Sequence, residues 1–145
     1  MKKEVIIEKL RQIFTNSELE DLEFDDDSEI RFKDYVPEDD MQIGMFFFHN
    51  NQLYLGALAG PPNYVSLGSI EQLNDIFYRP FPNDGILDII FDFGDYRLSC
   101  CHVEYRNEVI GIYNCKQEEW VLYESSMEKS TTIQETIDKI MNTNA

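Results

Sequence analysis

Cysteine, positive charge and long hydrophobic runs are all scarce in this sequence, and each shortage excludes a class of protein. Three cysteines, two of them adjacent, do not form the framework of a disulfide-stabilised secreted domain. No apolar run approaches the roughly 18 residues of a membrane helix. Glu4 and Glu8 interrupt the N-terminal apolar stretch, which is therefore not typical of a signal peptide. We expect a soluble, cytoplasmic protein whose cysteines remain thiols.

Basic residues number 12 against 28 acidic residues, a formal net charge of −16. Nucleic-acid binding depends on neutralising phosphates with Lys and Arg, and binding to anionic membranes needs the same residues. The balance therefore argues against nucleic acid and against a membrane as partner. It favours a basic protein or a cation, or it serves solubility alone.

Motifs for metals, cofactors and catalysis are also missing. There is no CxxC pair for zinc, and the prolines of Ala59-Gly60-Pro61-Pro62 lack the amide donors of a phosphate loop. An EF-hand loop that begins at Asp25 needs Gly and Glu at the positions of Ile30 and Val36. No spacing selects a carboxylate pair for glycoside hydrolysis. We predict no cofactor, no metal site and no enzymatic activity.

What the sequence does contain is enough apolar material for one domain over residues 1–145, with 43% hydrophobic and 13% aromatic residues. Its patterns predict an α+β fold. An antiparallel sheet, made of a hairpin plus a four-stranded meander, packs with about three helices.

The helices are predicted from apolar residues spaced three and four apart. The second has the Ser-x-x-Gln spacing of a capping box at Ser69 and Gln72 and ends at Pro80 and Pro82. The third repeats that spacing at Thr131 and Gln134. The predicted apolar faces are Val5, Ile6, Leu10, Ile13 and Phe14, then Ile70, Leu73, Ile76 and Phe77, then Ile133, Ile137, Ile140 and Met141.

The hairpin is predicted from the apolar runs 41–48 and 53–58, with a turn at His49-Asn50-Asn51-Gln52, because Asn tolerates left-handed backbone. An even loop places Phe46 and Phe48 beside Leu53 and Leu55. Met45, Phe47, Tyr54 and Gly56 then share the other face. Both faces are apolar, so either both are covered or one is kept for a partner.

The meander is predicted at Ile86–Phe93, Tyr96–Tyr105, Val109–Cys115 and Trp120–Glu124. Gly94-Asp95 suits a type II′ turn, which fixes the register of the first two strands. That register pairs Phe93 with Tyr96, Phe91 with Leu98, and Ile89 with Cys100, and sets Asp92 opposite Arg97 as an attractive pair.

The same register bears on Cys100-Cys101-His102, which has the residue types of a thiol–imidazole site. Cys100 and His102 share the face of Leu87 and Ile89, so we interpret Cys100 as a buried core residue. A two-residue turn at Asn107-Glu108 places Cys115 opposite Cys100, whereas a three-residue loop places it opposite Ser99.

Acidity is concentrated in residues 17–40, which hold twelve acids and two bases. Their net charge of −10 leaves −6 for the other 121 residues. We predict that this segment either binds a basic partner or is a solvated loop. The predicted partner-binding residues are Asp25, Asp26, Asp27, Glu29, Asp34, Tyr35, Glu38, Asp39 and Asp40, with Tyr54, Tyr64 and Trp120 as further aromatic anchors.

In size, acidity and α+β character the chain resembles the immunity proteins of bacterial polymorphic toxin systems, a resemblance without a shared residue motif. It implies a protein that binds and neutralises a basic cognate toxin, in many cases a nuclease. Two alternatives stay open: a DNA mimic that inhibits a nucleic-acid-binding protein, and a small enzyme of unknown chemistry. The oligomeric state is not predicted.

Overall fold

The protein is seen here in a computed structural model that describes residues 1–16, 42–56, 64–103, 106–123 and 130–143. The acidic segment predicted to bind a partner lies outside these residues. The described elements are α1 (Lys3–Asn16), β1 (Gln42–Ile43), β2 (Phe46–His49), β3 (Gln52–Gly56), β4 (Tyr64–Ser69), β5 (Asp75–Phe81), β6 (Ile86–Asp92), β7 (Tyr96–Val103), β8 (Arg106–Asn114), β9 (Glu119–Tyr123) and α2 (Ser130–Thr143).

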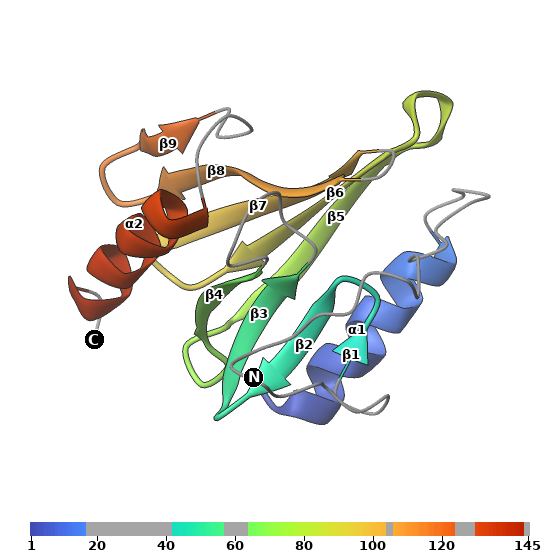
Figure 1. Ribbon diagram of the computed structural model, residues 1–145, viewed down its shortest axis with the longest axis horizontal. Coiled ribbons are helices and arrows are strands. Elements are labelled where there is room, and N and C mark those ends of the chain that lie inside the picture. The colour runs from blue at the N-terminus through green and yellow to red at the C-terminus, as the bar shows by residue number, and fades with distance from the viewer. Residues whose placement is uncertain (17–41, 57–63, 104–105, 124–129, 144–145) are drawn as a thin grey trace.

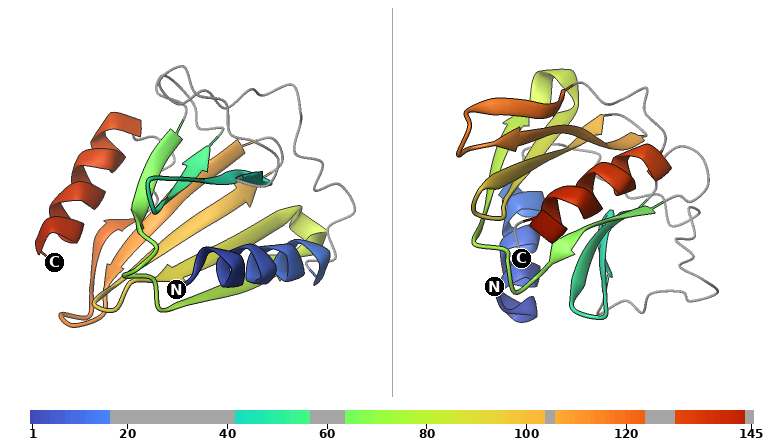
Figure 2. Two further views of the ribbon diagram at one scale, coloured as in Figure 1. Left: turned by 90° about the horizontal axis from the view of Figure 1, so that it is seen from below. Right: turned by 90° about the vertical axis from the view of Figure 1, so that its left-hand side faces the viewer.

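The strands form two antiparallel sheets, one in the order β1-β2-β3-β4 and one in the order β5-β6-β7-β8-β9 (Figure 1). Helix α1 contacts β1 and β5, and α2 contacts β4. Both helices pack on the side of the five-stranded sheet that faces the core, so neither described helix covers its opposite face (Figure 2). The α+β class is therefore as predicted. The arrangement differs, with two sheets and, among the described residues, two helices.

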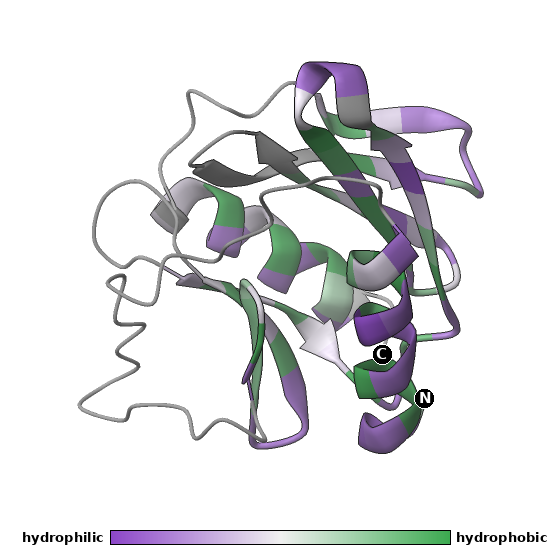
Figure 3. Cartoon of the chain, turned by 90° about the vertical axis from the view of Figure 1, so that its right-hand side faces the viewer, coloured by the Kyte–Doolittle hydropathy of each residue, from purple (hydrophilic) through white to green (hydrophobic). Residues whose placement is uncertain are grey.

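A single hydrophobic cluster joins the two sheets and both helices. Phe46 of β2 meets Phe91 of β6 edge to face, with ring centroids 5.2 Å apart. Hydrophobic and hydrophilic residues alternate along both helices (Figure 3), as expected when one face is buried. The buried helix residues are Ile6, Leu10 and Ile13 in α1 and Ile133, Ile137 and Ile140 in α2, all within the predicted faces, whereas Val5 is 43% exposed.

The predicted hairpin is confirmed in its register: Phe46 lies opposite Leu55, and Phe47 opposite Tyr54. Asn50 and Asn51 form the two-residue turn with φ values of 49° and 59°, as the turn chemistry requires. The run 41–48 is not one strand, however. Gly44 takes a φ of 59° and reverses the chain, so β1 folds back onto β2.

The predicted second helix is wrong. After Ser69 the backbone makes one turn, with the amide of Gln72 bonded to the carbonyl of Ser69 at 3.1 Å, and then enters β5. Seven residues of β5 pair with β6. This pairing stabilises the segment more than a helix would, because a helix that ends before Pro80 is short and only marginally stable. Pro80 is tolerated because β5 is an edge strand.

The predicted third helix is confirmed as α2, but Gln134 is not part of a capping box. The helix begins at Ser130, and the side chain of Gln134 turns to β4. Its oxygen accepts a hydrogen bond from the amide of Ser66 at 2.7 Å, and its nitrogen donates to the carbonyl of Ser66 at 3.2 Å. One side-chain amide thus satisfies an edge residue of the sheet as a neighbouring strand would.

The meander is confirmed, with the predicted pairs of Phe91 with Leu98 and Ile89 with Cys100. Gly94 has a φ of 88°, and the amide of Phe93 bonds to the carbonyl of Tyr96 at 2.9 Å. The next turn comes earlier than predicted, because Val103 already pairs with Arg106.

The earlier turn overturns both predicted positions of Cys115. Cys100 lies opposite Val109, and Ser99 lies opposite Gly111. Cys115 follows the end of β8, where its amide donates to the carbonyl of Asp95 at 2.8 Å. No disulfide joins the three cysteines, all of which the structure describes.

Candidate binding surface

The face of the five-stranded sheet that points away from the core carries aromatic residues beside charged ones. Because side chains alternate along a strand, the burial of Ile89 and Phe91 in the core sends Ile90 to the other side. We call this side the outer sheet face; by register it consists of Asp75, Phe77, Arg79, Asp88, Ile90, Asp92, Arg97, Ser99, Cys101, Gly111, Tyr113, Trp120 and Tyr123.

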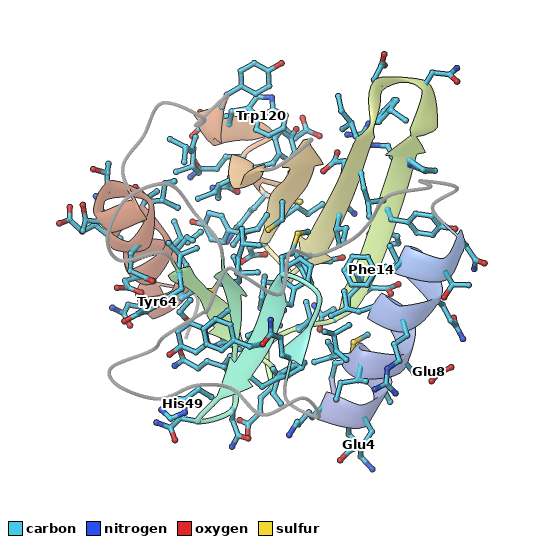
Figure 4. All side chains as sticks on the ribbon, turned by 45° about the vertical axis from the view of Figure 1, so that its right-hand side comes forward. Glu4, Glu8, Phe14, His49, Tyr64 and Trp120 are labelled. Atoms are coloured by element: carbon cyan, nitrogen blue, oxygen red, sulfur yellow. The ribbon has the colours of Figure 1, made fainter. Side chains whose placement is uncertain are left out.

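Trp120 is the centre of an aromatic cluster on this face. Its ring centroid lies 5.1 Å from that of Tyr113 and 4.9 Å from that of Tyr123. Trp120 is 50% exposed and Tyr123 is 62% exposed. In Figure 4, Trp120 lies at the end of the molecule opposite Glu4 and Glu8 of α1. The cluster therefore offers a large apolar area to solvent.

The indole ring of Trp120 packs against the backbone of Gly111. A Cβ atom at this position would lie 2.7 Å from the Cζ3 atom of Trp120, so only glycine leaves room for the ring against the backbone. A β-bulge in β9 supports the same arrangement: Tyr113 pairs with Trp120 and Gly111 with Tyr123. Trp120 and Tyr123 are three residues apart, yet the extra residue at the bulge keeps both on one face.

Between the aromatic cluster and the β5 edge, the outer sheet face combines an aromatic ring with a cation. The guanidinium of Arg97 lies 5.7 Å from the ring centroid of Phe77, which is 42% exposed. Asp92 lies opposite Arg97, as predicted. Its carboxylate accepts a hydrogen bond from the amide of Gly94 at 2.8 Å, so it stabilises the turn.

The same face carries an ion pair with one buried partner, formed by Arg79 of β5 and Asp88 opposite it on β6. The Oδ2 atom of Asp88 lies 2.8 Å from a guanidinium nitrogen of Arg79, and the side chains are 5% and 65% exposed. The Oδ1 atom of Asp88 is buried without a hydrogen-bond partner. Asp88 therefore depends on Arg79 for the compensation of its charge.

The predicted anchors separate into buried and exposed residues. Tyr54 stacks on Phe47 with centroids 4.9 Å apart, and both side chains are buried. Burial is the main cause that raises the pKa of Tyr54. The second face of the hairpin is thus covered, and Tyr54 is a core residue. Trp120 is exposed, and Tyr64 is half-buried with its ring against Phe47 and Tyr54. The predicted site residues of the acidic segment (Asp25, Asp26, Asp27, Glu29, Asp34, Tyr35, Glu38, Asp39 and Asp40) lie outside the described residues.

Cys100 is a core residue, as predicted. It is fully buried, and desolvation, followed by the charges of Asp88 and Cys101, raises its pKa well above the ordinary range. A thiol in this state is a poor nucleophile. The backbone of His102 lies opposite Leu87, on the core face, but its side chain is outside the description. Among the described residues, no group of three His, Cys, Asp or Glu side chains is placed to hold a metal ion.

Sequence reasoning selected Trp120 but missed the surface around it. Tyr113, Tyr123 and Phe77 join Trp120 only through the register of five strands and a bulge. The one usable signal was the density of aromatic residues between positions 113 and 123.

The comparisons with known proteins add no relative: no family model, no curated protein and no solved structure matches the chain. In the part of the chain that is described, neither helix is long and apolar enough to cross a membrane.

Proposed function

We propose that this chain is a protein-binding module that docks its partner on the outer sheet face, with Trp120 and Tyr123 as the main contacts. The exposure of both rings in one cluster is the observation that carries the proposal. Trp, Tyr and Arg are the residues most enriched among binding hot spots, and the outer sheet face presents all three types.

The partner is proposed to be basic. The chain carries −16, and the described residues adjoining Trp120 include the exposed Glu118 and Glu119. In this proposal the acidic residues of segment 17–40 attract the partner over distance, and the aromatic residues hold it once docked. An immunity protein that neutralises a basic toxin, such as a nuclease, is the specific form of this function that we propose.

The test compares two kinds of variant against the partner recovered from the native cytosol. Trp120→Ala should raise the dissociation rate and weaken binding by roughly 30-fold, the effect of a hot spot worth ~2 kcal/mol. Asp25, Asp26 and Asp27 changed together to Asn should mainly lower the association rate, and the difference should shrink as salt is raised to ~0.15 M. Val5→Ala, at an exposed position of α1, is the control and should change neither rate.

The outcome also separates the alternatives. A DNA mimic should lose most of its affinity through the triple Asn change and little through Trp120→Ala, because carboxylates then replace phosphates as the recognised groups. An enzyme should retain its activity in both variants. Equal recovery of the partner by wild type and Trp120→Ala would rule out the outer sheet face.

A further inference from the structure

The two described sheets have four edge strands, β1, β4, β5 and β9. Three of them are shortened, interrupted or covered. An open edge presents unpaired amides and carbonyls to other chains, so proteins shorten, cover or interrupt such strands. Strand β1 is two residues long and contacts α1. Strand β5 contains Pro80 and is tied to α1 by Lys9 and Asp75, which lie 3.0 Å apart.

The edge of β4 is covered most specifically. Helix α2 packs against this strand, and the amide of Gln134 bonds both the N–H and the carbonyl of Ser66. The protein thus satisfies an edge residue with a dedicated side chain. The fourth edge, that of β9, differs from these three.

Strand β9 has neither the proline nor the covering helix of the other edges, and its one interruption is the bulge at Val121. Its five residues contain no proline, and no described strand or helix pairs with the side that faces away from β8. It is also apolar, since Trp120, Val121 and Tyr123 are 50%, 41% and 62% exposed. Figure 1 shows β9 at the margin of its sheet. An exposed apolar edge of this kind is where an extended segment adds a strand.

We infer that β9 receives an extended, basic segment of the partner as a sixth strand, with Lys or Arg side chains lying over Trp120 and Tyr123. This inference rests on the proposed function and specifies how the partner docks. Main-chain hydrogen bonds to β9 supply the pairing. Alternate side chains of the added strand fall on the outer sheet face, where cations are attracted to the faces of aromatic rings, Trp most strongly.

The charge around β9 also favours a basic segment as the added strand. Glu118 and Glu119 are exposed at the start of the strand. An acidic segment would meet like charges there and the general repulsion of a chain that carries −16. A second copy of this chain would carry the same net charge of −16, so general repulsion disfavours it as the partner.

The test uses short synthetic peptides as probes and backbone amide shifts in NMR as the readout. A peptide of alternating lysine and valine should shift the amides of β9 and the indole N–H of Trp120. The same peptide N-methylated at every residue keeps its side-chain charge but loses all its backbone N–H donors, and should bind at least about tenfold more weakly. A glutamate–valine peptide should not bind.

Matched variants place the effect on β9. Val121→Lys adds a positive charge to the edge and should abolish binding of the lysine–valine peptide. Val5→Lys makes the same change at an equally exposed valine of α1 and should not. Equal binding of the N-methylated and parent peptides, or no binding of the parent at millimolar concentration, would overturn strand addition.

The outcomes also distinguish this inference from the proposed function. If Trp120→Ala loses the native partner but Val121→Lys retains it, the outer sheet face binds without an added strand. If protein concentration alone shifts the amides of β9, the occupant is a second copy and the basic segment is wrong.

Discussion

The indole ring of Trp120 lies against the backbone of Gly111, at a position where any Cβ atom would come within 2.7 Å of the ring. A residue without a side chain and the chain's one tryptophan thus form a single unit across β8 and β9. The glycine lets the indole lie against the sheet, and this orientation places it beside Tyr113 and Tyr123.

Gly111→Ala should displace the indole without unfolding the protein. Gly111 does not have a positive φ, so alanine fits the strand, and the stability should change by less than about 1 kcal/mol. The Trp120 fluorescence should shift, and the partner should bind more weakly. In a Trp120→Ala background the same change should have no further effect on binding, because the two residues act as one unit. Additive losses would contradict this coupling.

Gln134→Ala should destabilise the fold by about 1–3 kcal/mol, since it leaves the N–H and the carbonyl of Ser66 without their partner at the edge of β4. Glu135→Ala, at the adjacent exposed position, is the control and should stay within ~0.5 kcal/mol of the wild type. Urea unfolding measures both. If the two variants are equally stable, the contact between Gln134 and Ser66 does not contribute to the free energy of unfolding.

Arg79→Ala should cost about 1–3 kcal/mol of unfolding free energy, because it leaves the buried carboxylate of Asp88 without a cation. The value lies below that of a fully buried pair, since Arg79 is 65% exposed and water screens the interaction. Adding Asp88→Asn to Arg79→Ala removes the uncompensated charge and should restore part of the stability. A double variant no more stable than Arg79→Ala would show that the charge of Asp88 is not the cause.

The cysteines should differ in reactivity and in their effect on alkaline stability. Iodoacetamide should modify Cys115, which is partly exposed, while Cys100 should react only on unfolding. Burial holds the folded pKa of Cys100 above its unfolded value. Its contribution to stability is therefore complete below about pH 8.5 and is lost as the pH rises toward the folded pKa.

Urea unfolding between neutral and alkaline pH tests the second part of this prediction. Cys100→Ala lowers stability at every pH through the cavity it leaves, but its stability should fall less steeply with rising pH than that of the wild type. Parallel curves for the two proteins would remove Cys100 as a cause of the alkaline loss.

The sequence predicted those elements whose signals are local. The Asn50-Asn51 and Gly94-Asp95 turns require particular backbone conformations, so the residue types identified the turns, and each two-residue turn set the register of its hairpin. The helical spacing in α1 and α2 was equally direct, and so was the burial of Cys100 on the apolar face of β7.

Interactions between distant residues decided the rest. Residues 69–81 have helical spacing, but pairing with β6 makes them a turn and a strand. Gln134 has capping spacing, but an edge residue 68 positions away takes its amide. The outer sheet face exists only because five strands and a bulge align. A local sequence pattern does not show which side of a strand the rest of the chain will cover. The sequence alone therefore determined the Asn50-Asn51 and Gly94-Asp95 turns, the two helices and the acidity of this protein. Tertiary packing decided which aromatic residues are buried and which are exposed.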